Sequence, residues 1–367
     1  MIVLGAGLVG VATAWLLVNR GHSVCLVDPA GAGEQPAEAG TRAALGLLMA
    51  QVVRRSSGRG WRLRQRSLQL WQQWSDQLAE RGPALPIRPG LLQLAADPQE
   101  LELQQRLVQQ RQAKGFPLRL LSQDQLALLR PELPQAALGG LLSPLDGQLD
   151  PIASRQLLLQ DALSRGLELV SDRAEAIGAS SGATSGANAT PGANRWQVQL
   201  ASGQRLQTPW LLVCAGLASA ALLEPLGHQR PLAPVLGQAL ELQLPAGCDA
   251  DRWPGSVVWQ GINLVPRPGG RLWLGATLEP DLAAGAAGDP AALAALRQLK
   301  GHAPDWLREA TPLRIWQGLR ARPVGRPAPL LEALEPGLLL LSGHYRNGVL
   351  LAPASAEWAA DQIAAGP

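Results

Sequence analysis

Three glycines and an aspartate near the start of the chain have the types and the spacing of a dinucleotide-binding turn. Gly5, Gly7 and Gly10 form a G-x-G-x-x-G pattern directly after the apolar residues 1–4. The first glycine permits a tight turn, the second lets the backbone approach a pyrophosphate, and the third lets a helix pack against the strand. Asp28 follows 18 positions after Gly10, where its carboxylate can accept hydrogen bonds from ribose hydroxyls. The pattern predicts binding of a nucleotide with an ADP half, and by itself it does not distinguish NAD from FAD.

The elements that must position these residues are a strand at 1–4, a buried helix over 8–19 and a second strand at 24–27. Gly21 is placed to end the helix. A membrane anchor is the alternative, because the first 19 residues carry no side-chain charge. The glycines and the second apolar strand argue against an anchor, and no basic residue precedes the apolar run as a signal peptide requires. We therefore expect a strand–turn–helix–strand unit and no integral membrane segment.

The composition indicates a folded protein with a sizeable core. Of the 367 residues, 47% are apolar and 17% are charged, and the net charge is only +3. The three cysteines have no spacing that suggests a disulfide frame or a metal site, which favours a reducing, cytoplasmic location. The densest basic cluster has no nucleic-acid-binding motif around it, so we expect a solvated loop and helix face and no nucleic-acid partner. This cluster comprises Arg54, Arg55, Arg59, Arg62, Arg64 and Arg66.

The remaining patterns predict an α/β fold in which a parallel nucleotide-binding sheet is interleaved with an antiparallel sheet. Apolar residues at helical spacing predict a long helix near 60–80, and an apolar run predicts a buried strand at 338–341 before a closing helix. Several strand-like runs between 235 and 280 are typical of antiparallel pairing. Further predicted features are a turn at 146–151, a flexible surface loop at 179–195, and strands at 196–200, 205–208 and 211–214.

Six segments occur in the order found in one known family. They are AALGLLMAQ at 43–51, SPLDGQLDP at 143–151, LLVCAGLAS at 211–219, LVPRPGGRLWLGAT at 264–277, QGLRARP at 317–323 and SGHYRNGVLLAP at 342–353. With the opening glycine pattern, the chain resembles the FAD-dependent D-amino acid oxidase family, and within it the glycine oxidases that serve thiamine biosynthesis. The resemblance implies FAD as the cofactor. It also implies an FAD-binding Rossmann-like domain of residues 1–80, 145–225 and 316–367, and an interleaved antiparallel-sheet substrate domain of residues 81–144 and 226–315.

The resemblance assigns the FAD contacts in four groups. The ADP part is implied at Gly5, Gly7, Gly10 and Asp28. The pyrophosphate and the flavin are implied to be lined by Thr41, Arg42, Gly46, Leu47 and Leu48, and the adenine side by Ala174 and Gly216. The other edge of the flavin ring is implied to lie along Gly343, Arg346, Asn347, Gly348, Val349 and Leu350.

The implied chemistry is loss of a hydride from the amino acid Cα to the flavin, so that the protein's task is to orient the substrate. A planar guanidinium that clamps the substrate carboxylate suits this task. The resemblance places it at Arg320, and Arg322 is the alternative, because an alanine follows Arg320 where the family usually has proline. Arg346 is implied at the edge of the active site. Asn263 stands where the family often has a tyrosine near the substrate, and Leu278 where it often has methionine.

The implied reaction converts glycine or a small D- or secondary amino acid to an imine that hydrolyses to an oxo acid, while oxygen becomes hydrogen peroxide. His344 is not needed as a general base in such a reaction. The implied partners are the amino acid and molecular oxygen, and a homo-oligomer is compatible with the sequence. Two alternatives stay open: a dehydrogenase that passes electrons to a quinone or a protein, and a flavin-containing assembly protein without turnover.

Overall fold

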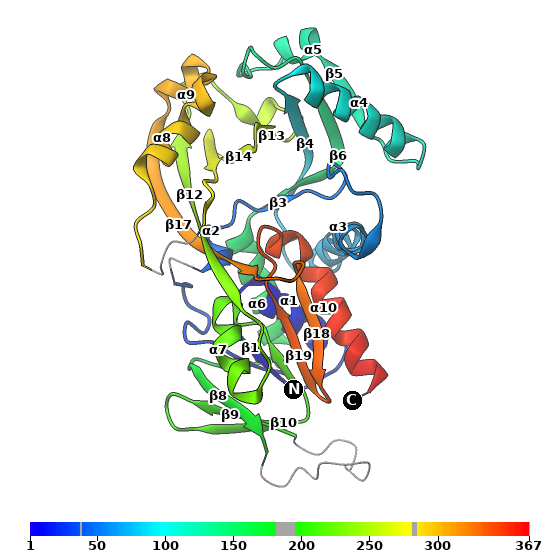
Figure 1. Ribbon diagram of the computed structural model, residues 1–367, viewed down its shortest axis with the longest axis vertical. Coiled ribbons are helices and arrows are strands. Elements are labelled where there is room, and N and C mark those ends of the chain that lie inside the picture. Colours follow the sequence, from blue (N-terminus) through cyan, green and yellow to red (C-terminus); the bar gives the residue numbers. More distant parts are fainter. Residues whose placement is uncertain (37–38, 181–194, 281–284, 367) are drawn as a thin grey trace.

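A six-stranded, mainly parallel sheet forms the frame of the lower lobe in Figure 1. The computed structural model describes residues 1–36, 39–180, 195–280 and 285–366, so positions 181–194 of the loop predicted at 179–195 lie outside the described residues. The strand order is β18-β19-β11-β1-β2-β7, and only the β18–β19 pair is antiparallel. The strand bounds are β1 Ile2–Leu4, β2 Cys25–Val27, β7 Glu168–Val170, β11 Leu211–Val213, β18 Leu330–Glu335 and β19 Leu338–Ser342.

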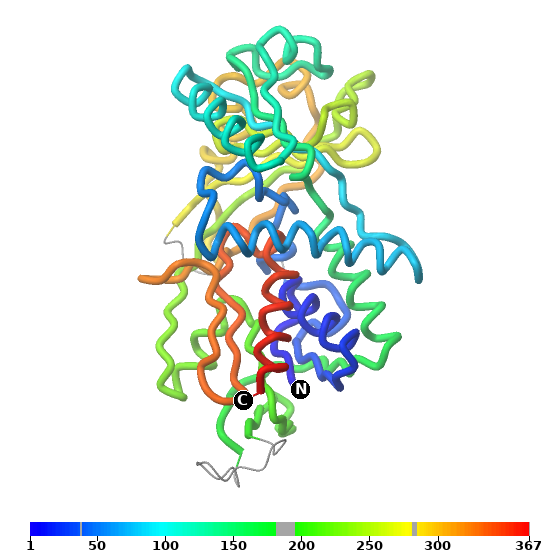
Figure 2. The backbone as a smooth tube through the Cα atoms, turned by 90° about the vertical axis from the view of Figure 1, so that its right-hand side faces the viewer, coloured from blue at the N-terminus to red at the C-terminus, as the bar shows by residue number. Residues whose placement is uncertain are grey.

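Several helices share one core with this sheet, and the N-terminal unit is confirmed. Helix α1 spans Leu8–Asn19, as the sequence predicts, and Figure 2 shows it beside the C-terminal helix α10, with α3 crossing between the two lobes. The apolar faces of α1, α3, α6 and α10 meet in the largest core cluster, which contains Trp15 and Trp71. The helix bounds are α3 Gly58–Ala79, α6 Pro151–Ser164, α7 Ser219–Leu223 and α10 Gly348–Ala365.

Helix α10 contains a proline whose effect is compensated by α3. Pro353 lies inside the helix and has no N–H to donate to the carbonyl oxygen of Val349. The indole Nε1 of Trp71 donates to that oxygen instead, at 3.1 Å, and Ser67 Oγ accepts the N–H of Ala354 at 3.1 Å. These bonds tie the first turns of α10 to α3 and so fix the place where α10 begins.

The upper lobe is built on a ten-stranded sheet that is antiparallel except for the β13–β4 pair, which confirms the antiparallel block predicted for 235–280. Its two longest strands, β12 and β17, pair along their whole length and reach down to the lower lobe (Figure 1). The strands are β3 Leu47–Leu48, β4 Ile87–Ala95, β5 Arg119–Ser122, β6 Gly139–Leu149, β12 Leu232–Gln243, β13 Ser256–Trp259, β14 Ile262–Arg267, β15 Arg271–Gly275, β16 Glu279–Pro280 and β17 Thr311–Pro323. The helices of this lobe are α4 Pro98–Gln112, α5 Gln123–Ala127, α8 Pro290–Arg297 and α9 Asp305–Glu309.

A small antiparallel sheet of β8, β9 and β10 lies at the bottom of the lower lobe (Figure 1). Its strands span Ala174–Ala179, Trp196–Leu200 and Arg205–Thr208, which confirms the last two as predicted. The domain boundaries predicted at 145 and 316 fall inside the continuous strands β6 and β17, and that division stays a prediction.

The turn predicted at 146–151 is wrong. Strand β6 continues to Leu149, because β3 pairs with Gly147 and its neighbour on one side while β4 pairs on the other. Tertiary pairing thus overrides the local turn signal. Asp150 then caps helix α6, since its Oδ1 accepts the N–H groups of Ile152 and Ala153 at 2.9 and 3.0 Å.

Candidate active site

The phosphate-binding turn has the geometry that the glycine spacing predicts. Gly5 has φ +98°, a conformation that favours glycine. A Cβ at Gly10 would overlap the carbonyl of Gly5, so α1 packs directly on the turn. Helix α1 begins after Gly7 with no side-chain cap and no acidic residue in its first turn. Its N-terminal N–H groups therefore present the positive end of the helix dipole to a pyrophosphate.

Asp28 and Thr41, which are far apart in sequence, both bind this turn. Asp28 Oδ2 accepts the N–H of Ala6 at 2.7 Å, and its Oδ1 accepts the N–H of Ala30 at 2.9 Å. Thr41 Oγ1 accepts the N–H of Leu8, the first residue of α1, at 2.9 Å. A hydroxyl from another segment thus satisfies one of the N–H groups that the helix itself leaves unpaired.

The predicted flavin-lining segment crosses from the lower lobe to the upper sheet as α2 Gly40–Ala43 and strand β3. Two side chains of the upper sheet hold its backbone. Arg267 NH2 donates to the carbonyl oxygen of Leu45 at 3.1 Å, and Trp316 Nε1 donates to that of Ala43 at 3.3 Å. Leu48, at the end of the segment, packs in the same core cluster as the first turn of α10.

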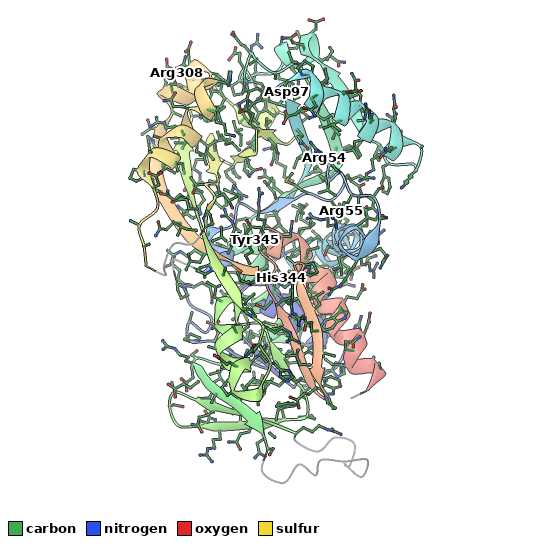
Figure 3. All side chains as sticks on the ribbon, in the orientation of Figure 1. Arg54, Arg55, Asp97, Arg308, His344 and Tyr345 are labelled. Atoms are coloured by element: carbon green, nitrogen blue, oxygen red, sulfur yellow. The ribbon has the colours of Figure 1, made fainter. Side chains whose placement is uncertain are left out.

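The second predicted flavin segment joins β19 to α10 where the two lobes meet, at the place where Figure 3 labels Tyr345. The N–H of Tyr345 donates to the carbonyl oxygen of Ala321 at 3.1 Å, so the loop is bound to β17. Helix α10 begins at Gly348 with no side-chain cap from Asn347 and no acidic residue in its first turn. Its free N–H groups form a second positive helix end beside the junction of the lobes.

His344 in this loop is a buried, neutral side chain. Its Nε2 lies 2.8 Å from Ser355 Oγ, and that hydroxyl donates to the carbonyl oxygen of Leu351 at 2.8 Å. The hydroxyl is therefore left to accept the Nε2–H of a neutral ring. Burial, and to a smaller extent the cation of Arg59, lowers the pKa of His344 to about 4. This environment agrees with the expectation that His344 is not a general base.

Arg320 lies across the sheet face with one edge of its guanidinium fixed and the other edge unpaired. NH1 donates to the carbonyl oxygens of Leu236 and Thr277, both at 3.2 Å. The guanidinium lies directly over Gly237, where any Cβ would overlap it. In the described part of the chain, Nε and NH2 have no hydrogen-bond partner, and the side chain is only partly buried. The free edge offers two N–H groups in the geometry that binds the two oxygens of a carboxylate.

The charges around Arg320 favour an anion. Burial lowers the pKa of Arg320, and the nearby cation of Arg346 lowers it further, while Tyr345 and Glu279 act in the opposite direction. Arg346 is exposed and, among the described residues, forms no ion pair or hydrogen bond. Two guanidiniums therefore approach each other with limited compensation, so a carboxylate that entered here would relieve their repulsion.

Asn263, on β14, and Leu278, which lies between β15 and β16, are the other two residues predicted as catalytic. Asn263 pairs with Gly275 across β14 and β15, and its Nδ2 donates to the carbonyl oxygen of Gly275 at 2.9 Å. Leu278 follows Thr277 and is 53% exposed. Of the residues predicted as catalytic, Arg320 and Asn263 thus lie on one face of the upper sheet, Arg346 lies near Arg320 in the loop before α10, and Leu278 follows directly after Thr277.

The alternative clamp and the remaining predicted contacts lie around this centre. Arg322 stands two residues further along β17 on the same face as Arg320, opposite Ala233. The carbonyl oxygen of Gly216 accepts a hydrogen bond from Ser342 at 2.9 Å, which places it at the end of β19. Ala174 opens β8, below the parallel sheet.

Arg42 and Arg155 bind the loop that follows Asp28. Arg42 pairs with Glu34 at 2.7 Å and donates to the carbonyl oxygen of Gln35 at 2.9 Å. Arg155, from α6, donates to the carbonyl oxygens of Ala6 and Gly31 at 2.6 and 3.0 Å. Arg155 was not predicted from the sequence, since nothing in its local pattern distinguishes it from an ordinary helix arginine.

A separate hollow of about 710 Å³ opens on the same sheet face at the other end of β12. Its arginines are compensated by acids: Arg88 pairs with Asp251, and Arg271 and Arg314 both pair with Glu241, at 3.3 and 3.4 Å. The buried Arg267 lines its wall and stacks on Trp273, with Cζ 3.6 Å from the ring centroid. The hollow thus differs from the Arg320 region in its charge balance.

Three further residues of the Arg320 region were missed from sequence: Gly237, Tyr345 and Glu279. Gly237 carried a usable signal, because a glycine inside a strand often marks a close approach of other atoms. Tyr345, which has φ +54°, and Glu279 carried none, since their role depends on which strands lie next to β17.

Comparison with known proteins identifies the class of the chain. A model of the DAO family, described as FAD dependent oxidoreductase, matches residues 1–362. The glycine oxidase of Bacillus licheniformis is 26% identical over 374 residues, which cover 100% of this chain and 93% of that protein. The crystal structure of glycine oxidase from Geobacillus kaustophilus has a TM-score of 0.85 at 23% identity, covering 100% of this chain and 94% of that one.

Higher identity is confined to part of the chain. The glycine oxidase of Pseudomonas putida is 38% identical over 170 residues, which cover 45% of this chain and 44% of that protein. The match to the glycine oxidase of Pseudomonas aeruginosa likewise covers only 40% of the relative. The chain therefore spans less than half of the length of these two relatives in the matched regions.

The chain belongs to the DAO family of FAD-dependent oxidoreductases, and FAD is its cofactor. Within that family it is similar to glycine oxidases, and its fold is theirs. The predicted fold class, an α/β protein with a parallel FAD-binding sheet and an antiparallel sheet, is confirmed. None of the described helices is both long and apolar enough to span a bilayer.

Proposed function

We propose that the protein oxidises glycine or a small D- or secondary amino acid, with transfer of the electrons to molecular oxygen. For glycine the balanced reaction consumes oxygen and one water and releases glyoxylate, ammonia and hydrogen peroxide. The observation that supports this proposal most directly is Arg320, whose guanidinium is held by one edge while two N–H groups of the other edge remain unpaired. Its similarity to glycine oxidases supports the same substrate class.

The residues present fit FAD at the predicted positions. The start of α1, where Thr41 occupies only the N–H of Leu8, and the close turn at Gly5 and Gly10 suit the pyrophosphate. Asp28 follows the end of β2, where it suits the ribose. Segment 40–48 and the start of α10 suit the two edges of the ring system. We assign the flavin to the space between these segments and the sheet face that carries Arg320.

The chain's own residues bind and orient the substrate in this proposal. FAD supplies the acceptor for the hydride that leaves the substrate Cα. Arg320 binds the carboxylate through Nε and NH2, and we prefer it to Arg322 because its free edge and its fixed edge are both defined. Arg346 adds positive charge at the same place. A protein base for the Cα hydrogen is not required, which suits the neutral and buried state of His344.

We also propose, from the resemblance, that the imine product supplies the thiazole ring of thiamine. An imine hydrolyses readily in water, so a reaction that consumes it directly must follow closely. The amino acid substrate and this use of the product are both parts of the proposal.

An anaerobic titration of the purified FAD-loaded protein tests the reaction. Glycine, sarcosine and D-alanine are added separately, and flavin absorbance near 450 nm is followed, a wavelength typical of oxidised flavins in general. Loss of this absorbance with at least one of the three supports the proposal. Absence of bleaching with all three, while dithionite still bleaches the flavin, contradicts it.

Admission of air after reduction tests the electron acceptor. Rapid return of the absorbance with stoichiometric hydrogen peroxide is expected for an oxidase. Slow return in air but fast return with a soluble quinone would instead identify a dehydrogenase.

A further inference from the structure

Asn263 faces the same space as Arg320. Directly opposed residues of neighbouring strands point to the same face of a sheet, and Asn263 is opposed to Gly275. A Cβ at Gly275 would point toward Leu45, which belongs to the segment predicted to line the flavin. The side chain of Asn263, which is partly buried, therefore leaves the sheet on the flavin side.

Hydrogen bonding fixes which end of the Asn263 amide faces this space. The carbonyl oxygen of Gly275 can only accept, so the group 2.9 Å from it must be Nδ2. The other end of the amide, Oδ1, then points away from Gly275. Within the described part of the chain, Oδ1 accepts no hydrogen bond. Asn263 thus presents an unpaired, uncharged acceptor, where a tyrosine would present a hydroxyl.

The two side chains are held by backbone groups that lie close together in the chain. Arg320 NH1 is bound to the carbonyl oxygen of Thr277, and Asn263 Nδ2 is bound to that of Gly275, two residues earlier. Two residues of extended chain span at most about 7 Å. The two carbonyl groups that hold these side chains therefore lie within about this distance, and the donor edge of Arg320 and the acceptor of Asn263 belong to the same face of the sheet.

We infer that Asn263 Oδ1 accepts an N–H from the substrate amine while Arg320 binds the carboxylate of the same molecule. This assignment rests on the proposed function and makes Asn263 a residue that selects α-amino acids over other small carboxylates. An amide oxygen orients the amine without the negative charge that would hold its extra proton. The amine must be neutral when hydride leaves the Cα, so an uncharged acceptor suits the reaction better than a carboxylate.

The test compares glycine with acetate, which has the carboxylate but no amine. Dissociation constants for both are measured anaerobically on the FAD-loaded protein from changes in the flavin spectrum, together with the rate of flavin reduction by glycine. We expect Asn263→Leu to lower the ratio of reduction rate to dissociation constant for glycine about 10-fold, the scale of one lost hydrogen bond. The dissociation constant of acetate should change less than twofold. Arg320→Gln is the matched comparison, and it should weaken both ligands.

A second variant separates amine binding from a structural role. Asn263→Asp keeps the shape of the side chain but adds a negative charge, which stabilises the protonated amine. The acidic limb of the pH profile of glycine oxidation should therefore move to higher pH in Asn263→Asp. Val265→Ala, two residues along the same strand on the same face, removes no amide and should leave that limb where it is in the wild type.

Each result has a defined meaning. The inference is supported if Asn263→Leu lowers the ratio of reduction rate to dissociation constant for glycine without weakening acetate binding, and if Asn263→Asp moves the acidic limb of the pH profile to higher pH. Equal weakening of glycine and acetate, or an unmoved pH limb, overturns it and leaves Asn263 with the role of joining β14 to β15. If none of the amino acids reduces the flavin of the wild-type protein, the proposed function is contradicted. In that case, loss of the preference for binding glycine over acetate in Asn263→Leu would still support the assignment of Asn263. Wild-type protein that binds neither ligand overturns both.

Discussion

Arg320 and Arg267 project from the same face of the ten-stranded sheet, near opposite ends of β12. Both are taken out of water, and burial lowers the pKa of each, that of Arg267 to about 10. Arg267 is 7% exposed, stacks on Trp273 and donates to the carbonyl oxygens of Leu45 and Leu149 at 3.1 and 3.5 Å. Arg320 binds two carbonyl oxygens through one nitrogen only.

The charges near the two arginines differ more than their burial does. Asp150 and Glu241 both oppose the lowering of the pKa of Arg267, and Asp150 lies 4.0 Å from its NH1. Arg320 instead has the cation of Arg346 as its strongest charged neighbour. A buried cation whose neighbouring acids and carbonyl groups use its N–H groups contributes to structure, whereas one whose strongest charged neighbour is another cation, and which keeps free N–H groups, is suited to bind an anion. Burial alone therefore does not identify a binding arginine.

The largest effect should come from Arg320. We expect Arg320→Gln to lower kcat/KM for the amino acid about 100-fold, because removal of one partner of a charged pair costs ~2–5 kcal/mol and each 1.4 kcal/mol is tenfold. The melting temperature should fall less than in Arg267→Met, because the carbonyl oxygens of Leu236 and Thr277 lose NH1 at a partly exposed position where water can replace it. Steady-state kinetics with a coupled peroxide assay measures the first quantity and thermal unfolding the second.

Arg322→Gln is the control for this experiment, because Arg322 lies on the same strand face two residues away. A loss of kcat/KM in Arg322→Gln as large as that in Arg320→Gln would remove the distinction between the two arginines. A loss in Arg322→Gln alone would transfer the clamp to Arg322.

Arg267 should show the opposite pattern. We expect Arg267→Met to lower the free energy of unfolding by ~2–4 kcal/mol, because two carbonyl oxygens lose their donor and Asp150 loses a neighbouring cation. FAD should dissociate more readily, since Arg267 holds the backbone of Leu45, while kcat/KM per bound FAD should change less than about threefold. Urea unfolding and the ratio of flavin to protein absorbance measure these effects. Unchanged stability with a large loss of kcat/KM would place Arg267 in the substrate site and end the contrast with Arg320.

The smallest effect concerns His344 and the dependence of the free energy of unfolding on pH. The folded protein keeps His344 neutral, with a pKa of about 4 against an ordinary value of 6.5. The unfolded chain therefore binds more protons between these two values, so the stability due to this residue is fully present above pH 6.5 and is lost as the pH falls toward 4. We expect His344→Gln to remove about 2 kcal/mol of the stability change between pH 6.5 and 5.

Urea unfolding of the FAD-loaded wild type and of His344→Gln at pH 7.5, 6.5, 5.5 and 5 checks this expectation. The two stability curves should converge as the pH falls. Curves that stay parallel would mean that His344 takes up its proton at the same pH in the folded and the unfolded chain, which would contradict its burial as a neutral ring.

Much of the lower lobe could be predicted because its signals are local. The glycine pattern, the uncharged run of residues 8–19 and the apolar run of 338–341 each specify an element from neighbouring residues. The turn predicted at 146–151 failed for the converse reason. Its Gly and Asp residues carry a local turn signal, but β3 and β4, about 100 and 60 positions earlier in the chain, pair with the backbone there and extend the strand.

The candidate site was only partly predictable for the same reason. The resemblance implied Arg320, Arg346, Asn263 and Leu278. The structure places Arg346 near Arg320 and Asn263 on the same sheet face as Arg320, and it leaves Leu278 exposed directly after Thr277. Which edge of Arg320 is free depends on carbonyl groups of Leu236 and Thr277, more than 40 positions away. No spacing rule relates such positions, since their proximity arises only when β12, β15 and β17 are side by side.

By itself, the sequence predicted a nucleotide with an ADP half at the first turn, because glycines at fixed intervals and a following carboxylate are typical of that turn. Only the tertiary structure decided which arginine has unpaired N–H groups and which end of the Asn263 amide faces the flavin segments. The physical reason is that hydrogen-bond donors are either used or left free by partners from distant strands, and those partners are chosen by sheet pairing.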